Sequence, residues 1–291
     1  MSISESTDNA IPIAAWDTVL FEKFRRFRWV VTTGLAGHSD ELLERRPYPA
    51  GARVLDVGCG FGDTTQRIAR QVGPQGAASG VDCAPSFIAA AKQEAQAAGL
   101  ANASFFVADV QTDDLRGPYD FLFARFGTMF FNAPVVALRN MRSVLRPDGE
   151  LAMIVWRRRE DNPWVHEAEL RVREIVPVVS REETDEVHCG PGPFSMAGAD
   201  PVSDMLRIAG YDRISFERFD TDICIGRTID DAIEFAMALG PAGEIIRLAG
   251  EAGEARKGDV TEALREAFAH HLQVDGVKMA SSSWFVTARN R

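Results

Sequence analysis

The sequence has few cysteines, and they are too scattered to form a disulfide framework or a zinc site. Its four cysteines show no C-x-x-C spacing and have no paired histidines near them: Cys59, Cys83, Cys189 and Cys224. Zinc sites use such spacings, and a disulfide framework is recognised from a regular pattern of several cysteines. We therefore expect neither feature.

Long apolar runs are also missing. No uninterrupted apolar stretch approaches the roughly 20 residues of a membrane span. Residues 1–10 are polar and include two acidic and no basic side chains, whereas a secretory signal begins with positive charge and continues with an apolar stretch. We expect a cytoplasmic protein without a membrane span.

Basic side chains are outnumbered by acidic ones. Lys and Arg total 32 against 42 Asp and Glu, which gives a net charge of −10. A general nucleic-acid surface needs a field of Lys and Arg to contact phosphates, so nucleic acid is not an expected partner. With 291 residues and 46% hydrophobic residues, the chain is long enough for one large globular domain or a core with appendages.

The most informative stretch that is present covers residues 54–65. A buried apolar strand leads into a glycine turn containing Gly58, Gly60 and Gly62, and a helix follows directly. Glycine has no Cβ, so the turn can adopt positive φ and let a ligand lie against the main chain at the carboxyl end of the strand. This pattern predicts a site for a nucleotide-like ligand.

Two acidic residues indicate which nucleotide-like ligand binds at this turn. A dinucleotide fingerprint needs a small third residue and binds pyrophosphate at the helix N-terminus, but the third position counted from Gly58 is Asp63. A carboxylate there repels pyrophosphate and suits an ammonium or a sulfonium. Asp82 follows the turn by about 20 residues, the spacing at which an acid reaches ribose hydroxyls. The pattern favours S-adenosylmethionine over NAD.

Apolar runs alternate with helical periodicity over residues 54–155, which is typical of βαβ units in a parallel, doubly wound sheet. We expect strands near 53–58, 77–81, 103–107, 119–124 and 150–155. Helices are expected near 63–72, 85–98 and 134–145, with a turn over 145–149 after the last of them.

These segments resemble the class I S-adenosylmethionine-dependent methyltransferases, and within them the ubiquinone/menaquinone-biosynthesis-like small-molecule branch. The matching segments are 54–62, 80–85, 105–110, 119–131 and 145–156. The resemblance implies an α/β fold with a doubly wound, seven-stranded, Rossmann-like sheet whose last strand is antiparallel. It also implies that S-adenosyl-L-methionine is the cofactor and S-adenosyl-L-homocysteine the product.

Outside this core, three segments are expected to form a helical cap over the cofactor, because insertions in such sheets gather beyond the carboxyl strand ends. A helix is expected over 201–209 and strands over 213–219 and 282–288; a capping box at Thr228–Asp231 predicts a helix that ends at Gly240. The expected units are a cap segment 1–47, the cofactor-binding core 48–156, a lid 157–200, a core continuation 201–225, a second helical insertion 226–281 and a final core strand 282–291.

The resemblance also implies which residues hold the cofactor. Asp82 is expected to bind both ribose hydroxyls, Asp109 the adenine amine and the Val110 amide the ring, whereas the Arg125 carbonyl holds the ligand ammonium beside the apolar wall of Phe126. The remaining candidates lie around the glycine turn and after the ribose acid: Asp56, Gly58, Cys59, Gly60 and Cys83.

Methyl transfer of this kind is an in-line displacement, so positioning supplies most of the catalysis and a general base is optional. His166 and His188 in the first insertion are the candidate bases. The Asp/Asn clusters with which catechol-type relatives hold magnesium are missing, so no metal is expected.

We therefore expect a methyltransferase that acts on a small, fairly apolar molecule through an oxygen, sulfur, nitrogen or carbon acceptor. One alternative is an NAD-linked oxidoreductase on a Rossmann fold, against which Asp63 and the missing third glycine weigh. Another is a non-catalytic protein that binds S-adenosylmethionine. The sequence leaves the oligomeric state open, a homodimer included.

Overall fold

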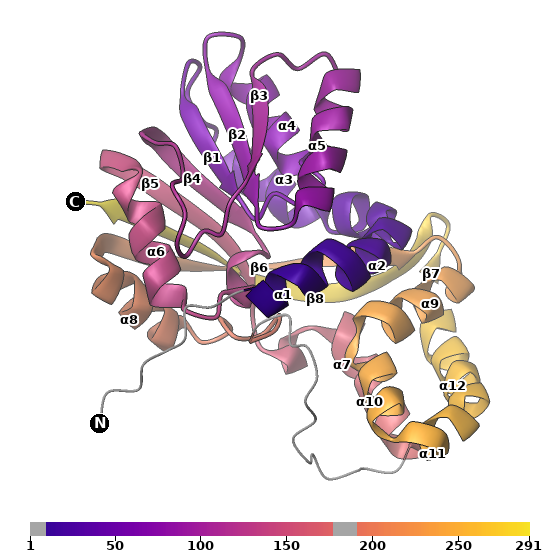
Figure 1. Ribbon diagram of the computed structural model, residues 1–291. Helices are drawn as coiled ribbons and strands as arrows, with labels where there is room; N and C mark the ends of the chain where they lie inside the picture. Colours follow the sequence, from indigo (N-terminus) through magenta and orange to yellow (C-terminus); the bar gives the residue numbers. More distant parts are fainter. Residues whose placement is uncertain (1–9, 177–190) are drawn as a thin grey trace.

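The computed structural model describes residues 10–176 and 191–291, and a mixed sheet forms its centre (Figure 1). The sheet has eight strands, and the main path runs in the order β3-β2-β1-β4-β5-β8-β6. The strands are β1 Arg53–Val57, β2 Ala77–Asp82, β3 Ala103–Val107, β4 Tyr119–Arg125, β5 Leu145–Trp156, β6 Tyr211–Gly226, β7 Leu272–Gln273 and β8 Gly276–Asn290.

The first five strands are parallel, and β8 runs antiparallel between β5 and β6. The predicted α/β, Rossmann-like sheet with its antiparallel last strand is thus confirmed, but the predicted count of seven strands is wrong. The eighth strand is β7, which pairs only Leu272 with Val277 and Gln273 with Gly276. Two residues are too few to show an alternating pattern in the sequence.

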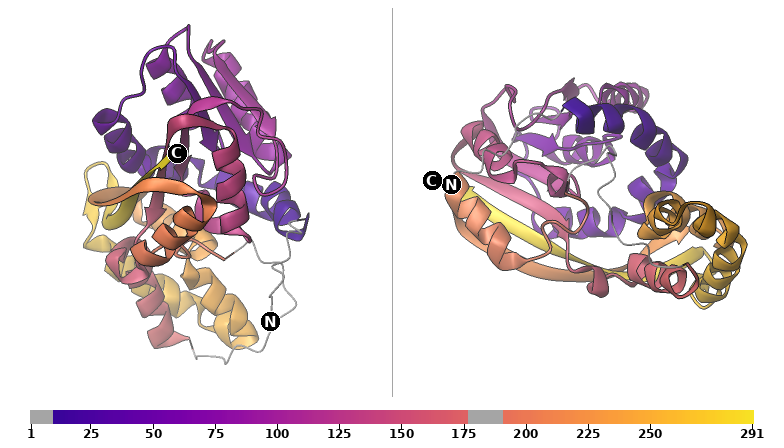
Figure 2. Two further views of the ribbon diagram at one scale, coloured as in Figure 1. Left: turned by 90° about the vertical axis from the view of Figure 1, so that its left-hand side faces the viewer. Right: turned by 60° about the horizontal axis from the view of Figure 1, so that its bottom comes forward.

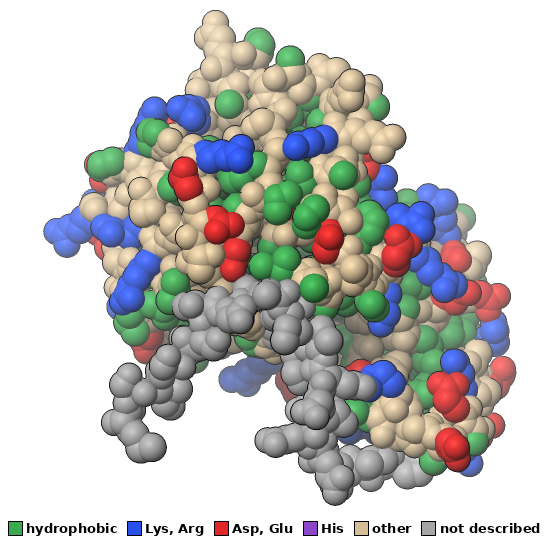
Figure 3. All heavy atoms as spheres, viewed as in Figure 1, with side chains coloured by type: hydrophobic (Ala, Val, Ile, Leu, Met, Phe, Trp, Pro, Cys, Tyr) green, Lys and Arg blue, Asp and Glu red, His purple; other side chains and the backbone are tan. Residues whose placement is uncertain are grey.

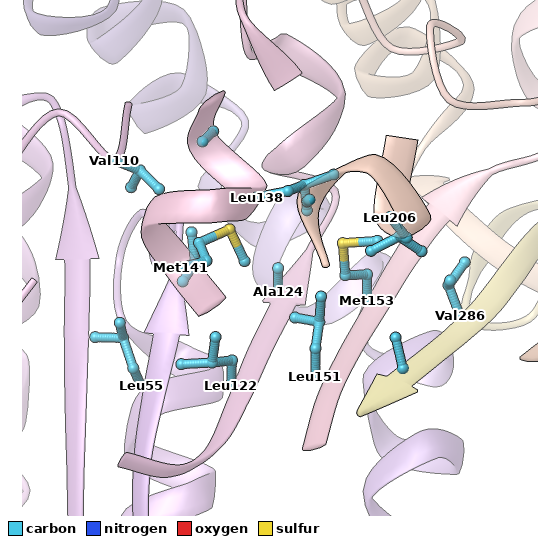
Figure 4. Packing of buried hydrophobic residues seen from close by; sticks show 14 of the residues in the cluster. Leu55, Val110, Leu122, Ala124, Leu138, Met141, Leu151, Met153, Leu206 and Val286 are labelled. Carbon is cyan, nitrogen blue, oxygen red and sulfur yellow. The ribbon is translucent and has the colours of Figure 1, made fainter. Parts of the chain in front are cut away.

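Helices cover both faces of the sheet. On one face lie α6 Pro134–Ser143 and α8 Ala199–Ala209. In Figure 4, Leu138 and Met141 of α6 point toward the strand residues Leu122 and Leu151 in the same buried cluster. A proline in the first turn begins α6, as it does α5, because its fixed φ suits that position.

The other face is covered by α3 Ala36–Arg45, α4 Asp63–Val72 and α5 Pro85–Ala97. Leu42 and Leu43 of α3 and Ile68 of α4 pack with the fully buried Phe123 of β4. Helices α4 and α5 lie where the sequence predicted them, as do the strands that they connect.

A separate group of helices forms a lobe beside the sheet, as the two views of Figure 2 show. It contains α7 Pro163–Ile175, α9 Ile229–Leu239, α10 Pro241–Leu248, α11 Gly250–Ala255 and α12 Lys257–Ala269. The predicted capping box at the start of α9 is confirmed, because Thr228 and Asp231 each accept a 3.1 Å hydrogen bond from the other's backbone amide. Phe27 and Val30 of the N-terminal segment lie in the buried cluster of this lobe.

The N-terminal segment is helical, as predicted, and passes between the sheet and the lobe (Figure 1). It comprises α1 Ala10–Ala15, η1 Trp16–Leu20, α2 Phe21–Arg26, η2 Val30–Gly34 and then α3. Asp17 of η1 accepts a 2.7 Å hydrogen bond from the Ser86 amide at the start of α5. This contact attaches the segment beside the end of β2.

Three strands have bounds that differ clearly from the predicted ones. The expected turn over 145–149 belongs to β5, which pairs Leu145 with Tyr119 and shifts register before Glu150 meets Phe121. The last strand begins at Gly276 rather than at residue 282, and β6 extends beyond the predicted 213–219 at both ends. Within the described part of the chain, every helix is too short or too polar for a membrane span.

Candidate functional site

A cavity lies at the carboxyl ends of β1, β2, β3 and β4, where the sequence places the glycine turn and the acidic residues. Nine of the ten predicted cofactor-binding residues are among those that line it: Gly58, Cys59, Gly60, Asp82, Cys83, Asp109, Val110, Arg125 and Phe126. Four neighbouring parallel strands thus bring residues from distant parts of the sequence to one edge of the sheet.

Asp82, at the end of β2, is held by two backbone amides. Its Oδ2 accepts from the Gly60 amide and its Oδ1 from the Ala84 amide, both at 3.0 Å. Burial raises the pKa of this carboxyl. A carboxylate has about four lone-pair sites, so each oxygen keeps the capacity to accept a further bond from a ligand in the cavity.

Asp109 and Val110 follow β3 and form the neighbouring part of the wall. The Asp109 carboxylate accepts from the Gln111 amide at 2.9 Å, and its own amide donates to Asp113 at 2.9 Å. These local bonds fix the turn after β3, so the Asp109 side chain has a defined position at the cavity.

The glycine turn brings the main chain close to its surroundings. Gly58 has a φ of +69° and Gly60 a φ of +51°, and both line the cavity. A Cβ on Gly58 would lie 3.2 Å from the Gly127 Cα. The missing side chain thus lets the glycine turn pack closely against the backbone after β4, and Gly58 and Gly60 present main-chain atoms to the cavity.

Gly62 has a different role from that of the other two glycines. Its Cβ would lie 2.7 Å from the Phe105 ring and 2.9 Å from the Ala91 Cβ, and its φ is +76°. It therefore provides the close helix–strand packing for which dinucleotide folds use their third glycine. From the sequence, all three glycines were expected to let the ligand approach the main chain, and the packing role of Gly62 was not predicted.

Asp63 faces the cavity and forms an ion pair that the sequence did not predict. Its Oδ2 accepts from the Arg125 Nη2 at 2.8 Å, and the side chains of Arg125 and Asp63 are 11% and 27% exposed. The Arg125 guanidinium also donates to the Val31 carbonyl at 3.4 Å and to the Ser39 hydroxyl at 3.3 Å. Arg125 thus connects the glycine turn to the N-terminal helices.

A largely aromatic, apolar wall forms another part of the cavity lining. Trp16 packs edge-on against Phe130 with a ring-centroid distance of 5.0 Å and lies 5.5 Å from Phe24. The other apolar members of this wall come from the N-terminal segment and from the chain after β4: Ile13, Val31, Leu35, Phe126 and Phe131. Trp16 and Phe24 of the N-terminal segment therefore both reach the cavity.

The structure does not bring Asp56 to the cavity surface. Asp56 is only 1% exposed, and its Oδ2 accepts from the hydroxyls of Thr64 and Thr65, each at 2.6 Å. Burial raises the pKa of this carboxyl to about 6. Asp56 joins β1 to the first turn of α4, and its predicted contact with the ligand stays a prediction.

The candidate bases also lie away from the cavity lining. His166 is on α7, where its Nδ1 is buried without a hydrogen-bond partner within the described structure. His188 lies outside the described residues. No histidine is among the described residues that line the cavity, so the role of either histidine as a base stays a prediction.

A histidine that the sequence interpretation passed over lies directly behind the cavity wall. His38 is fully buried on α3, with its Nε2 2.8 Å from the Ser281 hydroxyl and its Nδ1 2.9 Å from the Ser283 hydroxyl of β8. Because Ser281 donates its only proton to the Thr221 carbonyl, His38 must donate from Nε2 and accept at Nδ1.

His38 supports a stack of aromatic rings. Its ring packs edge-on against Phe126 and Trp156, which stack on each other at 3.8 Å. Phe126 has a φ of +56°, a conformation that costs a side-chain residue about 1 kcal/mol or more. The stack holds the Phe126 ring in place against the cavity. The serine run of residues 281–283 in a buried strand was the only sequence signal for a polar partner.

Burial, together with the nearby Arg125 guanidinium, lowers the pKa of His38 to about 3. A depressed histidine pKa means that the unfolded chain takes up the proton first, so stability is lost as pH falls from about 6.5 toward 3, by up to about 1.4 kcal/mol per pH unit. We expect His38→Gln to remove this dependence. Unfolding free energies of both proteins at pH 7.5, 6 and 5 test it, and parallel curves would contradict it.

Charged groups of both signs are interspersed on the face shown in Figure 3, and its visible described residues form no broad basic surface. Within residues 10–176 and 191–291, no group of three or more His, Cys, Asp or Glu side chains is arranged to hold a metal ion.

Residues 49–185 match the family model of a methyltransferase domain. The nocamycin O-methyltransferase of Saccharothrix syringae is 32% identical over 182 residues, which are 59% of this chain and 62% of the relative. The demethylmenaquinone methyltransferase of Listeria welshimeri is 27% identical over 144 residues, 48% of this chain and 60% of the relative.

Among solved structures, the fold is similar to that of phosphoethanolamine N-methyltransferase 2 from Haemonchus contortus in complex with S-adenosyl-L-methionine. The TM-score is 0.58 at 13% identity, and the match covers 96% of this chain and 60% of the other. The chain thus spans about three fifths of the length of the two curated relatives, 62% and 60%.

Proposed function

We propose that the protein transfers a methyl group from S-adenosylmethionine to a small, fairly apolar molecule, because residues 49–185 match the family model of a methyltransferase domain and the fold is similar to that of a methyltransferase solved in complex with this cofactor. The observation that carries the proposal is the cavity itself. Its lining combines backbone and carboxylates suited to a nucleoside with aromatic rings.

The residues present fit the cofactor. Asp82 has the capacity to accept from both ribose hydroxyls while it stays bonded to the Gly60 and Ala84 amides. Asp109 would accept from the adenine amine, with the Val110 amide beside it. Gly58 and Gly60 line the cavity with main chain, along which the ligand can lie.

When bound, the cofactor supplies a methyl group on a positively charged sulfur. The chain's contribution to an in-line displacement is to align the two reactants and to exclude water, and alignment alone can supply about 7–11 kcal/mol of the barrier. Phe126 and Phe130 give the site an apolar wall. Such surroundings favour the transition state, in which the positive charge of the sulfur is dispersed, over the ground state, in which it is localised.

The apolar wall also supports the proposed class of acceptor. Trp16, Phe24 and Phe131 offer ring faces and edges rather than charges, and such surfaces favour aromatic or polyketide-like molecules. The net charge of −10 supports a small molecule over a nucleic acid as the acceptor.

Incubation with methyl-labelled cofactor and a panel of thiols, phenols, amines and polyketide-like acceptors tests the proposal. We expect label in at least one apolar acceptor with wild-type protein and none with Asp82→Ala. Absence of transfer across a broad panel, with bound cofactor demonstrated, would favour the non-catalytic alternative.

A further inference from the structure

We propose that the Asp63–Arg125 ion pair is the receptor for the amino-acid end of the cofactor. The Arg125 guanidinium binds the α-carboxylate, and the Asp63 carboxylate binds the α-ammonium. This inference rests on the proposed function and adds to it the two side chains that recognise the part of the cofactor beyond its sulfur.

The order of the strands points the cofactor toward this pair. Asp109 follows β3, Asp82 ends β2, Gly58 follows β1 and Arg125 ends β4, and these strands are consecutive neighbours in the sheet. Adjacent strands lie about 4.8 Å apart, so the ends of β3 and β4 are separated by about 14 Å. A cofactor with adenine at Asp109 and ribose at Asp82 therefore directs its other end to β1 and β4.

The charges at this end match those of an amino acid. Of the described residues that line the cavity, Arg125 is the only one with a positive charge, so it is the one side chain there that attracts a carboxylate by charge. Asp63 is its direct neighbour at 2.8 Å. A zwitterion placed against this pair sets each of its charges opposite the complementary one.

Some N–H groups of the Arg125 guanidinium donate no hydrogen bond within the described structure. A guanidinium carries five N–H groups, and the hydrogen bonds that Arg125 makes go to Asp63, Val31 and Ser39. The last two are long, at 3.4 and 3.3 Å. The Nε–H and one Nη1–H take part in none of these bonds, so a ligand carboxylate can accept a charge-assisted hydrogen bond from either of them.

The environment strengthens such contacts. Arg125 and Asp63 are 11% and 27% exposed, and charges shielded from water interact more strongly than those in bulk solvent. The pair is therefore placed where recognition of a charged ligand group has a measurable effect on affinity.

Calorimetric titrations with two ligands that differ in the amino-acid end test the inference. S-adenosyl-L-homocysteine carries that end, and 5′-methylthioadenosine lacks it. We expect Arg125→Met and Asp63→Asn each to weaken S-adenosyl-L-homocysteine about 10- to 100-fold, as for loss of a charge-assisted hydrogen bond. Binding of 5′-methylthioadenosine should change by less than about 2-fold, and Arg125→Lys should restore part of the loss.

Arg157→Met is the matched control, because Arg157 is also an ion-paired arginine, 15% exposed, that directly follows a strand of the sheet but does not line the cavity. We expect it to bind both ligands like wild type. Equal losses for both ligands in Arg125→Met would overturn the inference and assign Arg125 to holding the N-terminal helices. Wild-type protein that binds neither ligand would overturn the proposed function itself.

Discussion

Replacing Asp82 with alanine is expected to lower the affinity for S-adenosyl-L-homocysteine at least about 100-fold. The wild-type carboxylate can accept two hydrogen bonds from the ribose, and a bond to a charged group contributes about 1.5–3 kcal/mol. Asp82 lies at the end of β2 with one backbone amide on each oxygen, so its orientation toward the cavity is fixed before a ligand arrives. Calorimetric titration of the variant measures the loss directly.

Two further variants separate binding from folding. Asp204→Ala on α8 removes an exposed carboxylate, 68% exposed in its pair with Arg207, and should leave both affinity and unfolding temperature unchanged. Asp82→Asn keeps one oxygen acceptor and should bind with an intermediate affinity. If Asp82→Ala folds and binds like wild type, the cavity does not hold the ribose at Asp82.

Replacing Gly62 with alanine is expected to lower the free energy of unfolding by about 2–5 kcal/mol. Part of the loss is the strain of a side chain at a φ of +76°, about 1–2 kcal/mol. The rest comes from a Cβ that would lie 2.7 Å from the Phe105 ring and 2.9 Å from Ala91, which forces α4, α5 and β3 apart and costs about 1–3 kcal/mol.

Gly99 provides the matched control for this prediction. It has a φ of +67° directly after α5, where the Gly99 and Leu100 amides donate to the Gln96 and Ala95 carbonyls as at a left-handed helix C-terminus, and nothing lies within 4 Å of the position that a Cβ would take. Gly99→Ala should therefore show the backbone strain alone. Denaturant unfolding of both variants measures the difference, and equal losses would mean that the close packing at Gly62 contributes nothing.

The parts of the fold that the sequence predicted well depend on local patterns. The Thr228–Asp231 capping box was predicted because both partners lie within one helical turn. The strand, glycine turn and helix around Gly58 followed from apolar runs and glycine spacing in the same way. The position of Asp82 at the cavity followed from its distance along the chain to that turn.

The parts that the sequence did not predict depend on contacts between distant residues. The Asp63–Arg125 ion pair joins positions 62 residues apart. His38 meets Ser281 and Ser283 across 243 and 245 residues. The serine run of β8 indicates a polar partner, but nothing in the local composition of α3 identifies His38 as that partner rather than as an exposed histidine. The packing of Gly62 against Phe105 could not be predicted for the same reason, because it depends on the relative positions of α4, α5 and β3.

The central claim is that the cavity at the carboxyl ends of β1–β4 is an S-adenosylmethionine site. Calorimetric titration of the wild-type protein with S-adenosyl-L-methionine and S-adenosyl-L-homocysteine, beside NAD, tests it most directly. We expect both sulfur nucleosides to bind at one site per chain and NAD not to bind. Binding of NAD alone would contradict the account and return the function to the oxidoreductase alternative.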